Sequence, residues 1–354
     1  MPRGPRTAVR FPEKLHHLAA ALAGGAASAT PLRLVAGDLD LLERNRVTAA
    51  VAHRAGQLEG AAALAEPLRP RLHLAAARVT ILIETLRQVA DVLGAAGVPW
   101  TPIKGGDLAF RAYDLAEDRD FGDLDILVAE RHRATAATAL AAAGWRPTFD
   151  ETHPVIEQYL RDEEYCAPFV GPFGLLLELH YRLWGAAPAG LADGVLAESA
   201  ADPQLAPLGR RITGAHAFIV AGFHVWTVPP PRAISNWWDL QRLASRGGAT
   251  FAASVVAAAR RWGVQLPVGM AAATAASLWP EEALSAIANQ LLVKLRPSER
   301  ALAAWGVRRG PDNVPYGSVV LARLLARRPS RHGWRSVWRR IWPHPAVRLM
   351  DGGA

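Results

Sequence analysis

The sequence is poor in cysteine and in long uninterrupted apolar runs. A single cysteine, Cys166, stands among 354 residues, so no intramolecular disulfide can form and no spacing of a structural zinc site occurs. An oxidising compartment is therefore not indicated, and we expect a cytoplasmic protein. Charged residues interrupt every apolar run well before the roughly twenty residues that a membrane span needs, so no transmembrane helix is predicted.

The chain does contain ample apolar material and an excess of positive charge. Hydrophobic residues make up 51% of the sequence, which is enough for a sizeable core. The net charge of +8 favours phosphate-bearing partners, although solvated arginine faces produce the same bias. Near the C-terminus, Trp334, Trp338 and Trp342 recur at helical spacing among arginines. Such a helix can dock on the protein, which we favour, lie on an anionic membrane surface, or stack on nucleic acid.

The hydrophobic pattern indicates two helical regions around a central sheet. Helical periodicity fills the first hundred residues, where Pro67 and Pro70 are predicted to separate two helices and Gly97 to end the second. After the centre, the pattern is helical again, with a break at Pro229–Pro231. We therefore predict an α+β fold in which a small mixed sheet is flanked by helices. The predicted regions are a helical N-terminal region (1–97), a sheet-containing core (98–185) and a helical C-terminal region with the basic tail (186–354).

The central region contains short extended runs separated by turns. VPWTPI (98–103) is followed by a glycine pair and the helical pattern DLAFRAYDLA, and DLDILVA (123–129) alternates as a strand does. A helix over 131–145 is predicted to end at Gly144. Two further runs, EEYCAPFV and GLLLELHYRLW, are joined by a turn rich in glycine and proline and predict a hairpin.

Asp123 and Asp125 are the first candidate functional residues. Side chains two apart on a strand point to the same face, so these carboxylates project together. Like charges at this spacing both remain ionised only when a cation neutralises them, and Mg²⁺ prefers oxygen ligands. Two solvated aspartates at a strand end are the alternative, and an isolated D-x-D does not decide between the two.

The residues around this pair favour a phosphate site. Gly105 and Gly106 lie between a strand and a helix N-terminus, where backbone N–H groups suit a phosphate, and the Lys104 ammonium can add a point charge. A tight turn would give the same glycines.

Glu178 and His180 form a second pair on one face of a later strand. A glutamate inside an apolar run needs a partner. That partner is either a metal ion shared with the two aspartates or an arginine such as Arg182. His180 either orients Glu178 or is a buried structural histidine.

IKGGDLAFRAY, followed by RDFGDLDILV and ELHYRLW, resembles the nucleotidyltransferase superfamily. More closely, it resembles a family of uncharacterised bacterial nucleotidyltransferases often found beside genes for peptide natural products. The K-G-G and R-x-x-x-D-x-D elements are also similar to AbiEii-type toxin nucleotidyltransferases. The motifs cover roughly residues 98–185.

The resemblance implies transfer of a nucleoside monophosphate from a nucleoside triphosphate to an acceptor hydroxyl of a small molecule or peptide, with release of pyrophosphate. It assigns two Mg²⁺ ions to the carboxylates of Asp123, Asp125 and Glu178, and the nucleotide phosphates to Lys104, Gly105, Gly106 and Arg119. The alternatives are a toxin-like enzyme acting on tRNA and a degenerate protein that only binds nucleotide.

Two more acidic residues bear on this interpretation. Asp107 departs from the superfamily pattern, and it would repel a triphosphate if it faced the glycine turn. Asp239 lies in NWWDLQRL, which resembles a D-L-x-x-L element of the family. We expect Asp239 to stabilise a helix N-terminus, with a contact to substrate as the alternative.

Overall fold

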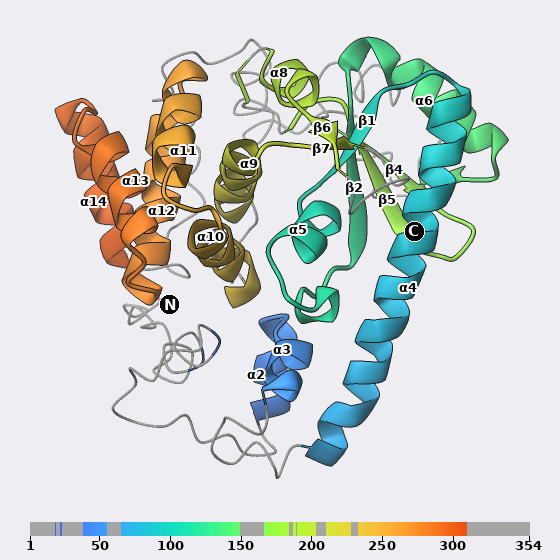
Figure 1. Ribbon diagram of the computed structural model, residues 1–354, viewed down its shortest axis with the longest axis horizontal. Coiled ribbons are helices and arrows are strands. Elements are labelled where there is room, and N and C mark those ends of the chain that lie inside the picture. The colour runs from blue at the N-terminus through green and yellow to red at the C-terminus, as the bar shows by residue number, and fades with distance from the viewer. Residues whose placement is uncertain are drawn as a thin grey trace, which may run out of the picture.

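The computed structural model describes Leu18, Leu22 and residues 38–54, 65–148, 166–183, 187–188, 190–202, 210–227 and 233–309. This part of the chain has the predicted α+β fold, with a five-stranded mixed sheet between helices (Figure 1). The strands are β1 (Trp100–Ile103), β2 (Asp123–Val128), β3 (Arg146–Pro147), β4 (Cys166–Val170) and β5 (Leu176–His180). A separate two-stranded sheet pairs β6 (Ala200–Ala201) with β7 (Arg210–Arg211).

The strand order of the main sheet is β1-β2-β5-β4-β3. β2 and β5 are parallel, and the other neighbouring pairs are antiparallel. The parallel register places Asp125 opposite Glu178, and the β4–β5 hairpin places Cys166 opposite His180. The predicted strands and hairpin are thus confirmed, and the two candidate acidic strands are neighbours.

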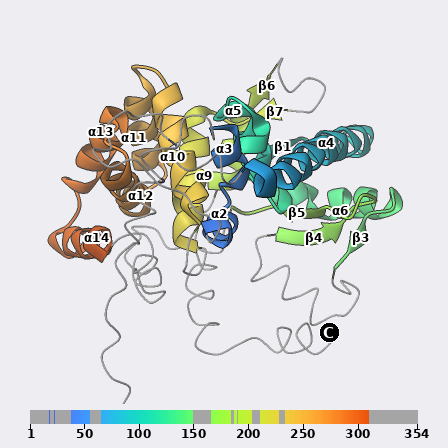
Figure 2. The same cartoon turned by 90° about the horizontal axis from the view of Figure 1, so that it is seen from below.

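One face of the sheet is entirely apolar. The long helix α4 (Ala65–Ala95) and α6 (Arg133–Ala142) cover it, and Figures 1 and 2 both show α4 running along the side of the sheet away from the C-terminal helices. Leu124, Ile126 and Val128 of β2 point into this core, together with Leu177 and Leu179 of β5.

The opposite face meets the N-terminal and C-terminal helices. Leu127 of β2 joins their core, so Asp123 and Asp125, which share its face, point the same way. The helices are α2 (Leu39–Arg44), α3 (Thr48–His53), α5 (Gly105–Arg111), α8 (Leu191–Ala197), α9 (Gly214–Thr227), α10 (Ile234–Arg246), α11 (Phe251–Arg261), α12 (Gln265–Leu278), α13 (Glu282–Leu292) and α14 (Pro297–Arg309). Strand alternation therefore separates one packing face from one polar face.

The predicted break at Pro67 and Pro70 is wrong, because both prolines lie within α4. Proline is tolerated in the first turn of a helix, where the backbone N–H has no intrahelical acceptor. Pro67 lies in that turn, and Pro70 removes only one bond just beyond it. The end of α4 is as predicted: Gly97 has φ +64°, and Val98 N–H donates to the Leu93 carbonyl at 2.9 Å.

Short stretches between the larger elements are 3₁₀ helices at Ala116–Asp118 and Glu130–His132. The helix predicted over DLAFRAYDLA is shorter than expected, since α5 ends at Arg111. No helix among the described residues combines the length and apolar composition needed to cross a membrane. The break at Pro229–Pro231 and the tail with Trp334, Trp338 and Trp342 lie outside the described residues.

Candidate active site

The acidic residues of β2 and β5 converge on the polar face of the sheet. The carboxylates of Asp125 and Glu178 both contact His180 Nε2, at 2.8 Å and 3.1 Å. They also share the Lys104 ammonium, which lies 2.5 Å from Asp125 Oδ1 and 3.7 Å from Glu178 Oε2. Asp123 lies on the same face of β2, two residues before Asp125. The structure thus brings Asp125, Glu178, Lys104 and His180 into contact, with Asp123 nearby on the same face of the sheet.

The local charges affect these carboxylates differently. Burial opposes ionisation of Asp125, but Lys104 and His180 outweigh it and lower the Asp125 pKa. For Asp123, burial, followed by the charges of Asp125 and Glu178, raises the pKa. A cation bound beside Asp123 would therefore favour its ionised form.

His180 is fully buried, and its environment favours the protonated form. Burial and the charge of Lys104 oppose protonation, but hydrogen bonds to Asp125 and Glu178 dominate and raise the His180 pKa. The prediction that His180 orients Glu178 is consistent with their 3.1 Å contact. The alternative salt bridge between Glu178 and Arg182 does not form, since Arg182 pairs with Glu130.

A cavity of about 250 Å³ opens beside these residues. Its walls combine the turn between α2 and α3, the turn before α5, β2, α9 and α10. Its cationic side chains are Arg44, Arg46, Lys104 and Arg119. Its other polar side chains are Asp123, Asp125, His224 and Asn236. Glu178 does not line the cavity, although its carboxylate reaches Lys104 and His180.

The glycine pair packs the start of α5 tightly against β2. A Cβ on Gly106 would lie 2.7 Å from Leu124 Cδ1, and one on Gly105 would lie 3.2 Å from Phe121 Cβ. Lys104, directly before the pair, has φ +49°, which is strained for a residue with a side chain. Packing is therefore a sufficient reason for the glycines, and the turn they permit aims Lys104 at the carboxylates.

Arg119 reaches the cavity from the segment before β2 and is held by α10. Its Nε donates to Asp239 Oδ1 at 2.7 Å, and the Tyr113 hydroxyl donates to the same oxygen at 2.7 Å. Burial opposes the charge on Arg119, but Asp239 outweighs it and raises the Arg119 pKa. The expectation that Asp239 stabilises a helix N-terminus is wrong, because α10 begins at Ile234 and Asp239 lies in its second turn. Asp239 instead orients a predicted phosphate-binding arginine.

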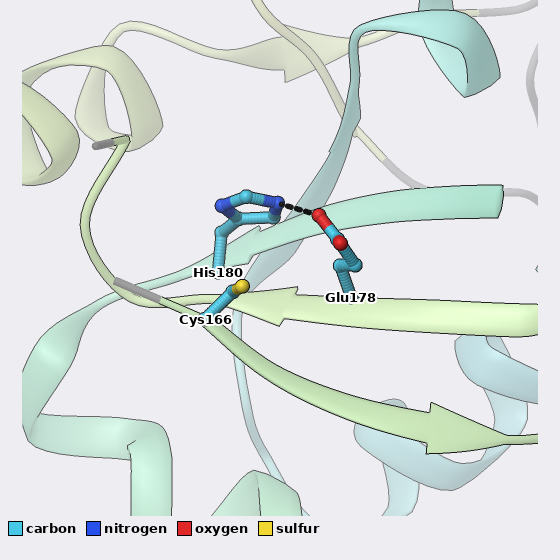
Figure 3. A group of neighbouring side chains, drawn as sticks. All are labelled: Cys166, Glu178 and His180. Carbon is cyan, nitrogen blue, oxygen red and sulfur yellow. Dashed lines mark hydrogen bonds and ion pairs between the residues drawn. The ribbon is translucent and has the colours of Figure 1, made fainter. Parts of the chain in front are cut away.

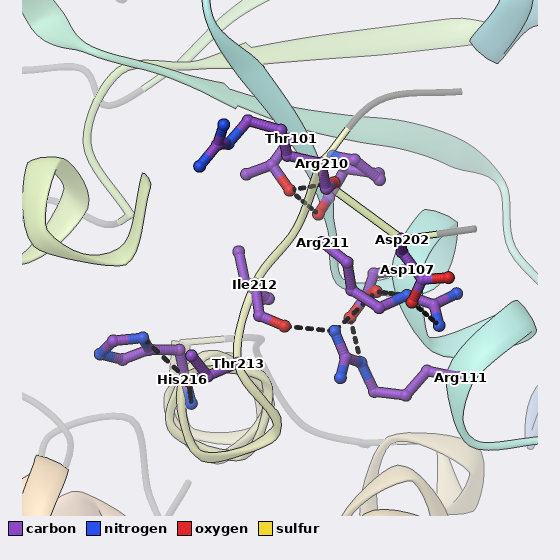
Figure 4. Close-up of polar contacts among 10 residues, drawn as sticks. Thr101, Asp107, Arg111, Asp202, Arg210, Arg211, Ile212, Thr213 and His216 are labelled. Carbon is purple, nitrogen blue, oxygen red and sulfur yellow. Dashed lines mark hydrogen bonds and ion pairs between the residues drawn. The ribbon is translucent and has the colours of Figure 1, made fainter. Parts of the chain in front are cut away.

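Asp107 does not face the glycine turn as an isolated charge. It is fully buried and accepts hydrogen bonds from Arg111 Nε at 2.8 Å and Nη2 at 3.1 Å, and it forms an ion pair with Arg211, whose Nε lies 3.3 Å from Asp107 Oδ1 (Figure 4). Thr101 Oγ1 also donates to the Arg210 carbonyl at 2.8 Å. Asp107 therefore ties α5 to β7, and the repulsion expected of it is offset by two arginines.

A second group of ligand-type atoms lies at the β4–β5 hairpin. The Cys166 thiol, the Glu178 carboxylate and the His180 imidazole offer atoms within 4.8 Å of one another (Figure 3). Cys166 was not predicted as a site residue, although a hairpin register that pairs it with His180 would have suggested it. Sulfur and imidazole suit softer metals, whereas the oxygens of Asp123, Asp125 and Glu178 suit Mg²⁺.

A larger cavity of about 560 Å³ lies between α9, α10 and α11. It contains none of the converging carboxylates of the sheet. The arginines that line it are paired: Arg111 with Asp107, Arg246 with Asp114, and Arg261 with Glu198. The smaller cavity is therefore the candidate active site.

Comparison with known protein families identifies the class of this protein, but not its substrates. A family model described as uncharacterised nucleotidyltransferase matches residues 38–280, which is more than half of the chain. The chain belongs to this family of nucleotidyltransferases. The match includes every residue that lines the smaller cavity, from Arg44 to Asn236. No curated protein matches the sequence.

Proposed function

We propose that the protein is a Mg²⁺-dependent enzyme that transfers a nucleoside monophosphate from a nucleoside triphosphate to a hydroxyl of a small molecule or peptide. The observation that carries this proposal is the convergence of Asp125 and Glu178 from adjacent parallel strands, with Asp123 on the same face, beside a cavity rich in cationic side chains. Family membership supports nucleotidyl transfer in general. Metal, donor and acceptor are parts of the proposal.

In this proposal the carboxylates of Asp123, Asp125 and Glu178 would hold two Mg²⁺ ions, and they would have to draw closer together to do so, because among the described residues only Cys166, Glu178 and His180 offer three ligand atoms within 4.8 Å of one another. The three carboxylates supply hard oxygen ligands, and a divalent cation would oppose the burial and the neighbouring carboxylates that raise the pKa of Asp123. When bound, Mg²⁺ would neutralise charge that develops on the triphosphate during transfer. The Cys166 thiol is not needed for this ligand set.

The cationic residues would bind and orient the donor. Lys104 projects from the turn before α5 and can move from Asp125 to a phosphate oxygen, since its ammonium is a flexible point charge. Arg119 is held in place by Asp239 and presents its guanidinium to the same cavity. Backbone N–H groups of Gly105 and Gly106 stand at the start of α5 and would face the phosphates.

Transfer then needs a proton acceptor for the attacking hydroxyl. The hydroxyl oxygen forms a bond to the α-phosphorus, the bond from that phosphorus to the bridging oxygen breaks, and pyrophosphate leaves. The hydroxyl proton passes to a carboxylate, for which Glu178 and Asp125 are the candidates. The lowered pKa of Asp125 makes it the weaker proton acceptor, whereas Asp125 and not Glu178 lines the cavity.

The double variant Asp123→Asn, Asp125→Asn tests the proposal. We expect it to remain folded and to lose pyrophosphate release from nucleoside triphosphates by at least about 10³-fold, since charge stabilisation at such sites is worth several kcal/mol. The assay uses a panel of hydroxyl-bearing small molecules and peptides with each triphosphate and Mg²⁺.

Asp91→Asn is the matched control, because Asp91 is exposed on α4, remote from the site. Undiminished pyrophosphate release by the double variant would refute the assignment of these carboxylates. Nucleotide binding by the wild-type protein without turnover of any acceptor would instead favour the degenerate, non-catalytic alternative.

A further inference from the structure

The cavity has a wall opposite the carboxylates that the acidic motifs do not explain. This wall is made by the turn between α2 and α3, which carries Arg46, and by the first turn of α10, which carries Asn236. Asn45 fastens the two together: its Oδ1 accepts from Ile234 N–H at 3.2 Å, and its carbonyl accepts from Ser235 N–H at 3.3 Å. Arg46 and Asn236 are therefore presented to the cavity as one unit.

Asn236 is buried with an unsatisfied hydrogen-bond acceptor that a ligand could pair. Its side chain is only 5% exposed, and its Oδ1 has no hydrogen-bond partner among the described residues. Leaving a buried acceptor unpaired destabilises the protein, because the amide oxygen has lost its hydrogen bonds to water. A ligand hydroxyl or amino group in the cavity would supply the donor that this amide oxygen needs.

Arg46 is also held in an unfavourable conformation. Its φ of +54° lies in the left-handed region, and in the described part of the chain only Arg46 and Lys104 among non-glycine residues have positive φ. Both line the same cavity. Such strain persists at functional sites, where the surrounding structure maintains it. The Arg46 side chain is exposed, and no carboxylate in the described part of the chain forms a salt bridge with it.

The charge of the cavity favours a polyphosphate. Four cationic side chains line it against two carboxylates, so positive charge exceeds what is needed to balance Asp123 and Asp125. Lys104 is engaged with Asp125, and Arg119 with Asp239. Arg44 Nε donates to the Asp40 carbonyl at 3.2 Å, which leaves Arg46 as the lining cation best able to meet an incoming anion.

We propose that Arg46 and Asn236 form the donor-recognition wall of the site. Arg46 binds the β- and γ-phosphates of a nucleoside triphosphate, and the Asn236 amide hydrogen-bonds a hydroxyl or amino group of its nucleoside. This inference rests on the proposed function and names residues for it outside the acidic strands and the glycine turn. The N-terminal helices thus contribute directly to substrate binding.

Calorimetric binding of nucleoside tri-, di- and monophosphates to the full chain, with Mg²⁺ and no acceptor, tests the two roles separately. Arg46→Gln should weaken binding of the tri- and diphosphate about tenfold, the effect of one charge-assisted contact, and leave the monophosphate unchanged. Asn236→Ala should weaken binding of all three by a similar factor of about ten, because the nucleoside is common to them.

Two further variants control for folding and surface charge. Arg46→Gly accepts the left-handed conformation without steric strain, so it should fold at least as well as the wild type and still show the Arg46→Gln binding defect. Arg87→Gln removes a 57% exposed arginine on α4 and should bind all three nucleotides like the wild type.

The outcomes separate this inference from the proposed function. If the Arg46 and Asn236 variants bind like the wild type while Asp123→Asn, Asp125→Asn abolishes Mg²⁺-dependent binding, the wall is not a donor site and the proposed function stands. Equal weakening of all three nucleotides by Arg46→Gln overturns its phosphate role. If the wild-type protein binds no nucleotide, the donor-recognition roles of Arg46 and Asn236 and the proposed nucleotidyl transfer are both overturned.

Discussion

At the scale of single residues, the acidic side chains of the site differ in their contacts with Lys104 and His180. Although Asp125 is buried, Lys104 and His180 lower its pKa, whereas burial and the neighbouring carboxylates raise the pKa of Asp123. A divalent cation and a triphosphate would therefore rearrange the partners of Lys104 more than those of His180, which is fully buried.

His224 should make the protein sensitive to acid. Burial, then the charge of Lys104, lowers its pKa from 6.5 to about 3, with Arg119 and Arg46 acting in the same direction and Asp125 against them. The unfolded chain binds a proton at His224 below about pH 6.5, and the folded chain does not until about pH 3. Stability should therefore fall as the pH drops through this window, by up to about 1.4 kcal/mol per pH unit from this residue.

Urea denaturation of the wild type and His224→Gln between pH 7 and pH 4 measures this contribution. The variant should lose less stability than the wild type as the pH falls, and the two should run parallel above about pH 6.5. Parallel curves over the whole range would mean that His224 is not held neutral.

Sequence reasoning predicts those residue contacts that follow from strand alternation. The 3.1 Å contact of Glu178 with His180 and the common face of Asp123 and Asp125 are of this kind. Contacts that depend on how distant segments pack are not predictable from one sequence. His224, for example, lies in the largely hydrophobic helix α9, and its neighbours along the chain give no indication that it lines the cavity.

At the scale of elements, the close packing of α5 on β2 positions the turn that carries Lys104. Gly106→Ala should destabilise the protein by about 1–3 kcal/mol, because its Cβ would overlap Leu124 in a filled core. The shift of α5 should also reduce Mg²⁺-dependent nucleotide binding. Urea denaturation and calorimetry measure the two effects.

Gly94→Ala is the matched substitution in a helix where nothing lies within 4 Å of the new Cβ. It should stabilise the protein by about 0.5–1 kcal/mol, the usual gain from replacing a helical glycine. If Gly106→Ala behaved like Gly94→Ala, tight packing would not be the reason for glycine at this turn.

The elements were predicted best where local signals are strong. The alternating pattern of β2 and the glycine at the end of α4 identify both elements in the sequence. The helix break predicted at Pro67 and Pro70 is wrong. A proline that interrupts a helix and one in its first turn cannot be told apart in the sequence until the N-terminus of the helix is known. α10 begins several residues before Asp239, and its first N–H groups donate to Asn45, which is too distant in the sequence for any local signal to indicate.

At the scale of the whole molecule, the candidate site draws on segments far apart in the sequence. Figure 1 shows α2 and α3 below α5, between α10 and α4, and Figures 1 and 2 show α9 and α10 between the sheet and the remaining C-terminal helices. The cavity takes Arg46 from the first of these regions, Asp125 from the sheet and Asn236 from the last. We therefore propose that the three predicted regions, 1–97, 98–185 and 186–354, act together and that the central one alone would not bind the donor.

The net charge of +8 does not by itself make tRNA the acceptor. Under our proposal, tRNA should bind only non-specifically, with Kd of about 10⁻⁴–10⁻⁶ M near physiological salt and a steep loss as salt rises. Fluorescence anisotropy with labelled tRNA across a salt series measures this. Nanomolar binding that persists at high salt, or nucleotide incorporation into tRNA, would favour the toxin-like alternative.

The most direct test of the central claim is anomalous diffraction from crystals grown with Mn²⁺ and a non-hydrolysable nucleoside triphosphate. We predict an anomalous peak bonded to carboxylate oxygens of Asp123 and Asp125, with the triphosphate in the cavity that Lys104 and Arg46 line. Mn²⁺ held only by Cys166, Glu178 and His180, or nucleotide bound elsewhere, would contradict the account.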